Sequence, residues 1–393
     1  MAKKAYIGVD GTARKMQKCY LGIDEVARAI KKAYIGVGGV ARPCWSLAPI
    51  EHYGINAFQQ SPRADHVAVT LGGYALFAGD AIGYNPLADI FDQSLTNVQV
   101  SVQMAPVRNL AATVIKTTNT EFAIFAGGLD VNDSPTDMMY IVDTSLTARQ
   151  LGRISAARGW FTATTVSSPD NSDAIAVFAG GSADSSSGFN TPYGGVDVLS
   201  SSLTYFTSAL HTPRCAHASA TAGQNALFAG GLETGYVASS NIESLNYSGT
   251  SSVLGFELMD PVYFNSATSN GSAAVFSCGY NSELGEYGRG TMPSVIDTSL
   301  TGRVIKSTEP VDRTLVAATT LGNYAMFGGG TGQSTMIYYN YDGLTAISGH
   351  PLSFPRFRAA ATTLGNYALF GGGGNSGDDL STSYTVDMYK LME

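Results

Sequence analysis

The chain has 393 residues and a formal net charge of -8, with 44% hydrophobic but only 14% charged residues. This length allows two or three ordinary domains or one large all-β domain. Gly, Ser, Thr and Asn take the place of the charged residues that most proteins have, which is typical of polar β-structure with many turns. The acidic balance argues against a nucleic-acid partner.

The charge is unevenly distributed along the chain. Residues 1–45 hold nine Lys/Arg and three Asp/Glu, a balance of +6, which leaves 14 basic and 28 acidic residues and a balance of -14 for residues 46–393. This contrast predicts an N-terminal module and a body with separate roles. The chain begins without the apolar run of a signal peptide, and no stretch approaches a membrane-spanning length. We therefore expect synthesis in the cytoplasm and no membrane insertion.

The N-terminal module repeats a Tyr-aliphatic-Gly strand three times with a period of 14 residues. Asp10-Gly11 and Gly38-Gly39 separate strand-like segments and are strong signals for tight hairpin turns. An isolated two-stranded hairpin is marginally stable in water. The basic charge favours a module that attaches the acidic body to a partner, and a cap on the body is the alternative. The residues expected to form this anchor are Tyr6, Ile7, Tyr20, Leu21, Tyr34, Ile35 and Trp45.

Part of this module carries a family resemblance. The Ala-Tyr-Ile-Gly-Val segments at 5–9 and 33–37 and the Gly-Val-Ala-Arg-Pro-Cys-Trp segment at 39–45 resemble the start of structural proteins encoded by phages and prophages of Gram-positive bacteria. In those proteins, similar segments precede unrelated C-terminal modules. The resemblance covers Lys3 to Trp45 only. It implies that this segment fixes the chain to a virus particle by binding other virion proteins.

The body repeats an apolar strand that ends in Phe and is followed by small residues, usually paired glycines. The intervals run from 43 to 53 residues, with a mean near 49. This spacing matches one four-stranded propeller blade, about 50 residues for a kelch repeat. Seven copies predict seven blades. The repeated positions are Phe77, Phe125, Phe178, Phe228, Phe276, Phe327 and Phe370.

An arginine precedes each of these strands except the fifth. It stands 14 residues before the Phe at Arg63, Arg214, Arg313 and Arg356, and Arg108 and Arg158 fill the same role with insertions. We expect each arginine to pair with an aspartate of its own or an adjacent blade. The candidate partners are Asp143, Asp297 and Asp387. A ring of guanidinium groups that binds anions is the alternative.

Glycine pairs after an apolar strand, with a Val-Asp-type strand downstream, resemble the kelch motif over residues 46–393. The chain lacks the family's usual Trp on the last strand, and its fifth unit has Ser277-Cys278-Gly279 in place of the glycine pair. The resemblance implies an all-β, seven-bladed kelch-like β-propeller. Because the last unit ends after its third strand, we expect a strand at about 52–61 to close the ring and remove the open edges.

The sequence offers no persuasive catalytic or metal site. Cys19, Cys44, Cys215 and Cys278 have no metal-ligand or disulfide spacing, so we expect four free, mostly buried thiols. His217 would share a strand face with Cys215, where core packing is the better interpretation. Neither a copper-oxidase set nor the repeated boxes of sialidases are present. We therefore expect no catalytic residue, cofactor or metal.

The loops that follow the glycines are the better candidates for function. They leave one face of a propeller, and tyrosines among small polar residues favour an adaptable binding surface. Plain solvated turns are the alternative. A calcium site at Asp130, Asn132, Asp133 and Asp137 is a further possibility, although such loops usually form turns. The candidate ligand-binding residues are Tyr84, Asp130, Asn132, Tyr193, Tyr236, Tyr280 and Tyr287.

These observations together predict a non-enzymatic phage virion protein of the tail or baseplate. The basic module would attach it to the particle, where it would form a homo-oligomer, and the propeller would bind a host-surface glycan or protein. A head-decoration or purely structural subunit is the second interpretation. A carbohydrate-active or oxidising propeller enzyme is the third, because propellers host both enzymes and binders.

Overall fold

The computed structural model describes the strand backbone between residues 6 and 46, and full residues over 49–80, 83–184, 189–281, 291–305, 313–341, 346–374 and 383–392. These residues form strands and turns and no helix. Within this part of the chain, therefore, no helix is long and apolar enough to cross a membrane. The chain divides into two compact units, Met1–Glu51 with Leu391–Glu393, and His52–Lys390.

The N-terminal unit contains the three predicted hairpins. They pair β1 (Tyr6–Val9) with β2 (Thr12–Lys15), β3 (Tyr20–Ile23) with β4 (Val26–Ala29), and β5 (Lys32–Val37) with β6 (Val40–Ser46). Two residues separate the strands in each hairpin. Each central aliphatic residue lies opposite an arginine, as Ile7 with Arg14, Leu21 with Arg28 and Ile35 with Arg42. The side chains of the predicted anchor, including Tyr6, Tyr20, Tyr34 and Trp45, lie outside the described residues.

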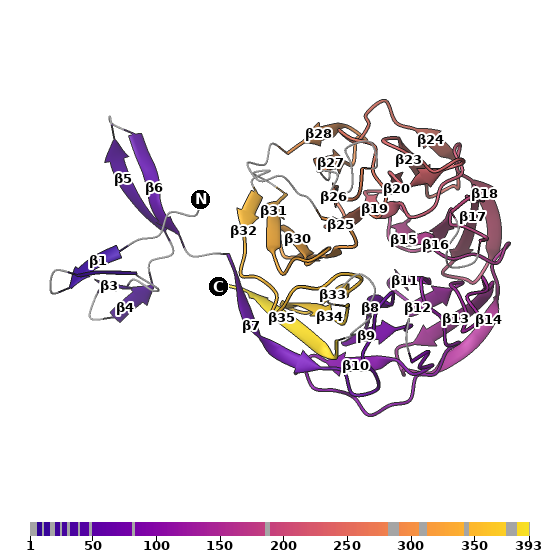
Figure 1. Cartoon of the computed structure of the whole chain (residues 1–393), viewed down its shortest axis with the longest axis horizontal. Coiled ribbons are helices and arrows are strands. Elements are labelled where there is room, and N and C mark those ends of the chain that lie inside the picture. The colour runs from indigo at the N-terminus through magenta and orange to yellow at the C-terminus, as the bar shows by residue number, and fades with distance from the viewer. Residues whose placement is uncertain are drawn as a thin grey trace. The chain divides into compact units, whose positions relative to one another are not determined.

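The larger unit is a seven-bladed β-propeller, as predicted (Figure 1). Blade one contains β8 (Val67–Leu71), β9 (Tyr74–Ala78) and β10 (Asp89–Asp92); blade two contains β11 (Ala111–Lys116), β12 (Glu121–Ala126), β13 (Met138–Asp143) and β14 (Ala148–Arg153); and blade three contains β15 (Thr162–Ser167), β16 (Ala174–Ala179), β17 (Gly195–Ser200) and β18 (Tyr205–Ala209). Blade four contains β19 (Ala218–Ala222), β20 (Asn225–Ala229), β23 (Ile242–Asn246) and β24 (Ser251–Val253), and blade five contains β25 (Ser266–Ser269), β26 (Ala273–Cys278), β27 (Thr291–Asp297) and β28 (Gly302–Val304). Blade six contains β29 (Ala317–Leu321), β30 (Tyr324–Gly328), β31 (Met336–Asn340) and β32 (Ala346–Ser348), and blade seven contains β33 (Ala360–Leu364), β34 (Tyr367–Gly371), β35 (Thr385–Leu391) and β7 (Ile50–Ala57).

Blades one and four depart from a plain four-stranded sheet. Blade one has three named strands, and residues 97–103 follow the outer edge of β10 through isolated bridges, such as Phe91 with Asn97. Blade four carries an additional hairpin, β21 (Leu232–Glu233) with β22 (Val237–Ala238), in its glycine loop. The other blades keep the four-strand order of the predicted repeat.

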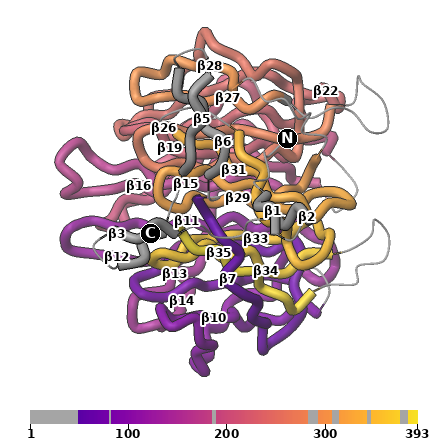
Figure 2. Tube along the Cα trace, turned by 90° about the vertical axis from the view of Figure 1, so that its left-hand side faces the viewer, coloured from indigo at the N-terminus to yellow at the C-terminus, as the bar shows by residue number. Residues whose placement is uncertain are grey.

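The ring closes by combining the two ends of the propeller sequence in one blade. Strand β7 takes the fourth place in blade seven, beside β35 (Figures 1 and 2). It occupies residues 50–57, a few residues before the predicted position at 52–61. The N-terminal side of the propeller therefore completes its last blade, so no seam opens between blades seven and one.

The repeated phenylalanines lie on the second strand of every blade and are all buried, between 0% and 2% exposed. The glycines after them lie against backbone and side chains of their own blade and of the next blade. Gly180 has φ +67°, and a Cβ there would lie 2.6 Å from His217 Cε1 in the next blade. Gly181 has φ +106° and would place a Cβ 2.8 Å from the Gly159 carbonyl oxygen. Both positions therefore require glycine for conformation and for space.

The arginines stabilise the blades from inside. Four of them are fully buried and pair with an acid on the third strand of the same blade, directly opposite the repeated Phe. The pairs are Arg63 with Asp89 at 2.8 Å, Arg158 with Asp197 at 2.5 Å, Arg214 with Glu243 at 2.7 Å, and Arg356 with Asp387. We call this arrangement the arginine clasp.

Several details of the predicted arginine pattern are wrong. Arg214 pairs with a glutamate, and Arg313, which is in none of the ion pairs of the described residues, donates through Nη1 to the carbonyls of Gly329 and Thr335. Asp143 and Asp297 do not pair with an arginine of this series, because each carboxylate accepts the backbone N–H groups of the Ser and Thr that follow it in a Ser-Leu-Thr turn. In blade two the structural equivalent of the arginine is Val107, whose carbonyl accepts the inter-blade bond from Asp80 N–H at 3.0 Å. Arg108 is one residue later and pairs with Asp133.

Candidate functional site

One residue of each blade belongs to a closed ring of backbone hydrogen bonds around the central channel. The residue lies just before the innermost strand, and its N–H donates to the carbonyl of the equivalent residue in the preceding blade, over 2.8–3.3 Å. The bond from Asp65 to the Arg358 carbonyl, at 3.2 Å, closes the ring. This channel-mouth ring consists of Asp65, Asn109, Trp160, Ala216, Phe264, Leu315 and Arg358.

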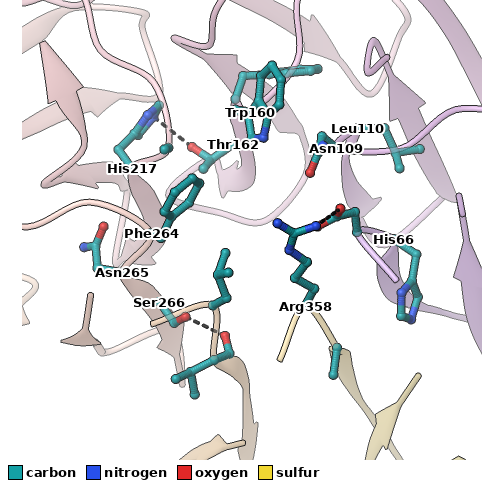
Figure 3. Close-up of a pocket in the computed structure, with 16 residues that line it drawn as sticks. His66, Asn109, Leu110, Trp160, Thr162, His217, Phe264, Asn265, Ser266 and Arg358 are labelled. Atoms are coloured by element: carbon teal, nitrogen blue, oxygen red, sulfur yellow. Dashed lines mark hydrogen bonds and ion pairs between the residues drawn. The ribbon is translucent and has the colours of Figure 1, made fainter. Parts of the chain in front are cut away.

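The backbone of the channel-mouth ring is unusual. All seven residues have φ between 51° and 58°, a conformation that large side chains rarely adopt. The ring of hydrogen bonds holds them there. Strain of this kind tends to gather at functional sites, where the surrounding structure enforces it. The seven residues line a hollow of about 290 Å³, and Trp160, Asn109, Arg358 and Phe264 lie around it in Figure 3.

The channel-mouth ring lies at the same end of the blades as the glycine loops. Two residues before each ring member, a carbonyl accepts an N–H from the preceding blade over 2.7–3.0 Å. The donor is the second glycine of the pair in five blades, Asp80 in blade one and Gly279 in blade five. The Arg214 carbonyl, for example, accepts from Gly181 N–H at 2.9 Å, and the ring member Ala216 is two residues later. The predicted loop face and the channel mouth are therefore one surface.

The ring has two chemically different arcs. Blades seven, one and two contribute Arg358, Asp65 and Asn109, which form a polar arc. Blades three to six contribute an apolar arc, consisting of Trp160, Ala216, Phe264 and Leu315. Apolar and aromatic walls with a few convergent polar groups are characteristic of small-ligand sites.

The charges of the polar arc compensate each other. Arg358 Nη1 donates to Asp65 Oδ2 at 3.1 Å, and the two side chains are 33% and 9% exposed. Burial raises the pKa of Asp65, while the neighbouring Arg358 and Arg108 partly oppose the rise. The Arg358 guanidinium also lies over the Phe357 ring, 5.4 Å from its centroid. It is thereby held in place at the rim of the hollow.

An aromatic series extends from the apolar arc. Phe189, from the glycine loop of blade three, contacts Trp160 and Phe264, with ring centroids 5.0 and 5.7 Å apart. Phe189 thus connects Trp160 to Phe264 at the point where Ala216 stands between them in the channel-mouth ring. The contacts continue from Phe264 to Tyr263 at 5.3 Å and from Tyr263 to Tyr280 at 5.2 Å. All five rings are half-buried.

The structure separates the seven predicted loop residues. Tyr193 packs over the buried Arg158, 5.0 Å from ring centroid to guanidinium carbon, and so supports the clasp of blade three. Tyr84 accepts a hydrogen bond from Arg108. Tyr280 ends the aromatic series, and Tyr236 is 47% exposed on the extra hairpin of blade four. Tyr287 lies outside the described residues.

The remaining two predicted residues, Asp130 and Asn132, form a local turn. The Asp130 carboxylate accepts the N–H groups of Asn132 at 2.8 Å and Ser134 at 2.9 Å. Of the other candidate calcium ligands, Asp133 pairs with Arg108, and Asp137 pairs with Arg153 at 2.6 Å. Their carboxylates therefore serve separate partners. Among the described residues, no group of three or more His, Cys, Asp or Glu is placed to hold a metal ion.

The buried histidine and thiols of the inner strands serve packing. His217 Nε2 lies 3.0 Å from Thr162 Oγ1, and burial lowers the His217 pKa to about 3. Cys215 and Cys278 are free and buried, as predicted. Burial raises the pKa of Cys215 to about 12 and also raises that of Cys278. The predicted environments of Cys19 and Cys44 concern side chains outside the described residues.

The fold and this site define a class, a seven-bladed β-propeller with an amphipathic channel mouth. No protein-family model matches the chain, and no curated protein sequence matches it either. The function must therefore be argued from the site itself.

Proposed function

We propose that this chain is a non-enzymatic binding protein of a phage particle. The hairpins of residues 1–45 attach it to other virion proteins, and the propeller presents its channel mouth to a glycan or protein of the host surface. The observation that carries the proposal is the amphipathic channel-mouth ring, where seven equivalent positions combine into one polar and one apolar arc. A recognition surface on a repetitive scaffold needs different side chains at equivalent positions, and the channel-mouth ring has a different residue type in every blade.

Two further features support parts of this proposal. The central aliphatic residue of every N-terminal hairpin lies opposite an arginine, which suits an acidic, partly apolar docking partner. The glycine pairs at φ above +50°, with a Val-Asp-type strand downstream, support a kelch-type origin for the blades. Tail or baseplate is the proposed location, with head decoration as the second.

The experiment compares two forms of the protein on two targets. The full chain and a form lacking residues 1–45, which keeps the closing strand β7, are incubated with Gram-positive host cells and with phage particles that lack the protein. We expect both forms to bind cells and only the full chain to bind particles. Binding of the full chain to particles with no binding of either form to cells would contradict host recognition and favour a structural subunit.

A further inference from the structure

The channel mouth constrains the chemistry of its ligand through the arrangement of its two arcs. Arg358, Asp65 and Asn109 follow one another around the hollow, and Trp160, the ring neighbour of Asn109, begins the apolar arc that continues to Phe264. Figure 3 shows Phe264 across the hollow from Arg358 and Asn109. A suitable ligand therefore has hydrogen-bonding groups along one edge and an apolar face. A pyranose sugar combines these features, because its hydroxyls form the edge and its C–H groups form a face that packs on aromatic rings.

The charge of the polar arc decides between neutral and acidic sugars. Arg358 is already paired with Asp65 at 3.1 Å, so a carboxylate brought to Arg358 would also approach the Asp65 carboxylate. A hydroxyl group avoids this repulsion, because it donates to Asp65 and accepts from Arg358 or from the Asn109 amide. The pair can therefore bind a neutral ligand without being broken.

The dimensions of the hollow limit the part of the ligand that enters. Its volume of about 290 Å³ lies just below the range for small-ligand sites, about 300–1,000 Å³. A single sugar ring is therefore a better match than an oligosaccharide. The half-buried rings of Phe189, Tyr263 and Tyr280 extend the aromatic contacts of the apolar arc and offer contacts to the units that follow.

We propose that the channel mouth binds the terminal, neutral pyranose unit of a host-surface glycan, with its hydroxyl edge on Arg358, Asp65 and Asn109 and its C–H face on Trp160 and Phe264. This inference rests on the proposed function, because it chooses glycan over protein as the target. It also assigns the terminal sugar to the channel mouth and the adjoining units to the aromatic series.

The tryptophan content provides a direct measurement. The chain has two tryptophans, and Trp160 is a member of the ring, so Trp45→Phe in the full chain makes Trp160 the only indole reporter. Glucose, galactose, N-acetylglucosamine and glucuronic acid are titrated while Trp160 fluorescence is recorded. We expect a saturable change with at least one neutral sugar at a Kd of about 1–5 mM, which is ordinary for a ligand of about twelve non-hydrogen atoms. Glucuronic acid should bind more weakly than glucose.

Two further variants of the Trp45→Phe protein locate the binding site. Asn109→Ala should weaken binding by about three- to tenfold, the effect of losing one hydrogen bond. Val253→Ala, at a position that is 49% exposed on the outer strand β24 of blade four, is the control and should leave the titration unchanged. Unchanged melting temperatures confirm that both variants fold. The hollow at the opposite end of the channel, about 680 Å³, is lined without aromatic residues, so sugar bound there would not produce this pattern.

The outcomes distinguish this inference from the proposed function. If the full chain binds cells but no neutral sugar changes Trp160 fluorescence, the inference is overturned and the proposed function stands. Tighter binding of glucuronic acid, or cell binding that is lost on protease treatment and kept after periodate oxidation of vicinal diols, also overturns it. Saturable neutral-sugar binding that is sensitive to Asn109→Ala supports it, even if the tested cells lack the glycan.

Discussion

Breaking one arginine clasp should destabilise the propeller strongly, and removing both charges should restore most of the loss. In blade four, the Arg214 and Glu243 side chains are 0% exposed and 2.7 Å apart. Glu243 also accepts the backbone N–H groups of His211 at 2.6 Å and Thr212 at 3.1 Å. Arg214→Val would leave this carboxylate buried without its cation, at a cost of about 3–5 kcal/mol.

Blade two shows which residues can replace the Arg214–Glu243 ion pair. Blade two has Val107 at the arginine position and Tyr140 opposite the repeated Phe, so a blade of this propeller forms without the clasp. Arg214→Val combined with Glu243→Tyr copies that pair and leaves no buried charge. We expect the double variant to lose less than about 2 kcal/mol, because replacing a buried ion pair with packed residues is often close to neutral.

Thermal unfolding followed by circular dichroism measures the difference. For a unit of 339 residues, His52–Lys390, the entropy of unfolding converts 3–5 kcal/mol into a decrease in Tm of about 4–7 °C. Arg153→Val is the matched control, because Arg153 is 63% exposed in its pair with Asp137 and exposed pairs contribute about 0–1 kcal/mol. If the double variant melts at or below the temperature of Arg214→Val, the clasp is not an energetically coupled pair.

Three other predictions concern closure, acid stability and thiols. Deleting residues 1–61 removes β7 and exposes the edge of β35, so this form should aggregate while the form lacking residues 1–45 stays soluble; a soluble, cooperatively melting 62–393 protein would contradict the closure argument. The folded-state pKa of His217, about 3, lies below the unfolded value of about 6.5. The unfolded chain therefore binds the extra proton between these pH values, and stability falls as pH decreases through that window, by up to about 1.4 kcal/mol per pH unit. His217→Asn, which copies Asn265 in blade five, should flatten this part of the Tm–pH profile, and an unchanged slope would exclude His217 as its source. Cys215 and Cys278 should react with a thiol reagent only after denaturation, because both are buried with raised pKa values; mass spectrometry of labelled peptides would reveal any native-state reaction.

The sequence predicted the scaffold better than the site, for a physical reason. The repeated Phe and glycines must satisfy the same packing requirement in every blade, so they recur visibly and predict both the blade number and the closing strand. The channel-mouth ring also repeats in geometry, but its φ values come from the backbone ring and its side chains differ in all seven blades. Its only sequence signal is its position, two residues after the arginine in five blades.

The errors have equally specific causes. Asp143 and Asp297 are the same residue type as most of the clasp acids and also lie on third strands. Their carboxylates, however, accept hydrogen bonds from the backbone N–H groups of the Ser and Thr that follow them. The acid that pairs with an arginine stands opposite the repeated Phe, and that register becomes visible only once the strands are paired. Tyr193 lies over Arg158, a contact that its place in a loop does not indicate, and its role in ligand binding stays a prediction.

The most direct test of the central claim compares two single variants for binding to host cells. Trp160→Ala removes the largest side chain of the apolar arc, and Tyr236→Ala removes an exposed tyrosine of the loop face outside the ring. With labelled full-length protein, we expect Trp160→Ala to reduce cell binding by at least about tenfold at an unchanged melting temperature, and Tyr236→Ala to bind like the unmodified chain. Undiminished binding of Trp160→Ala together with loss of binding by Tyr236→Ala would contradict the channel mouth as the recognition site.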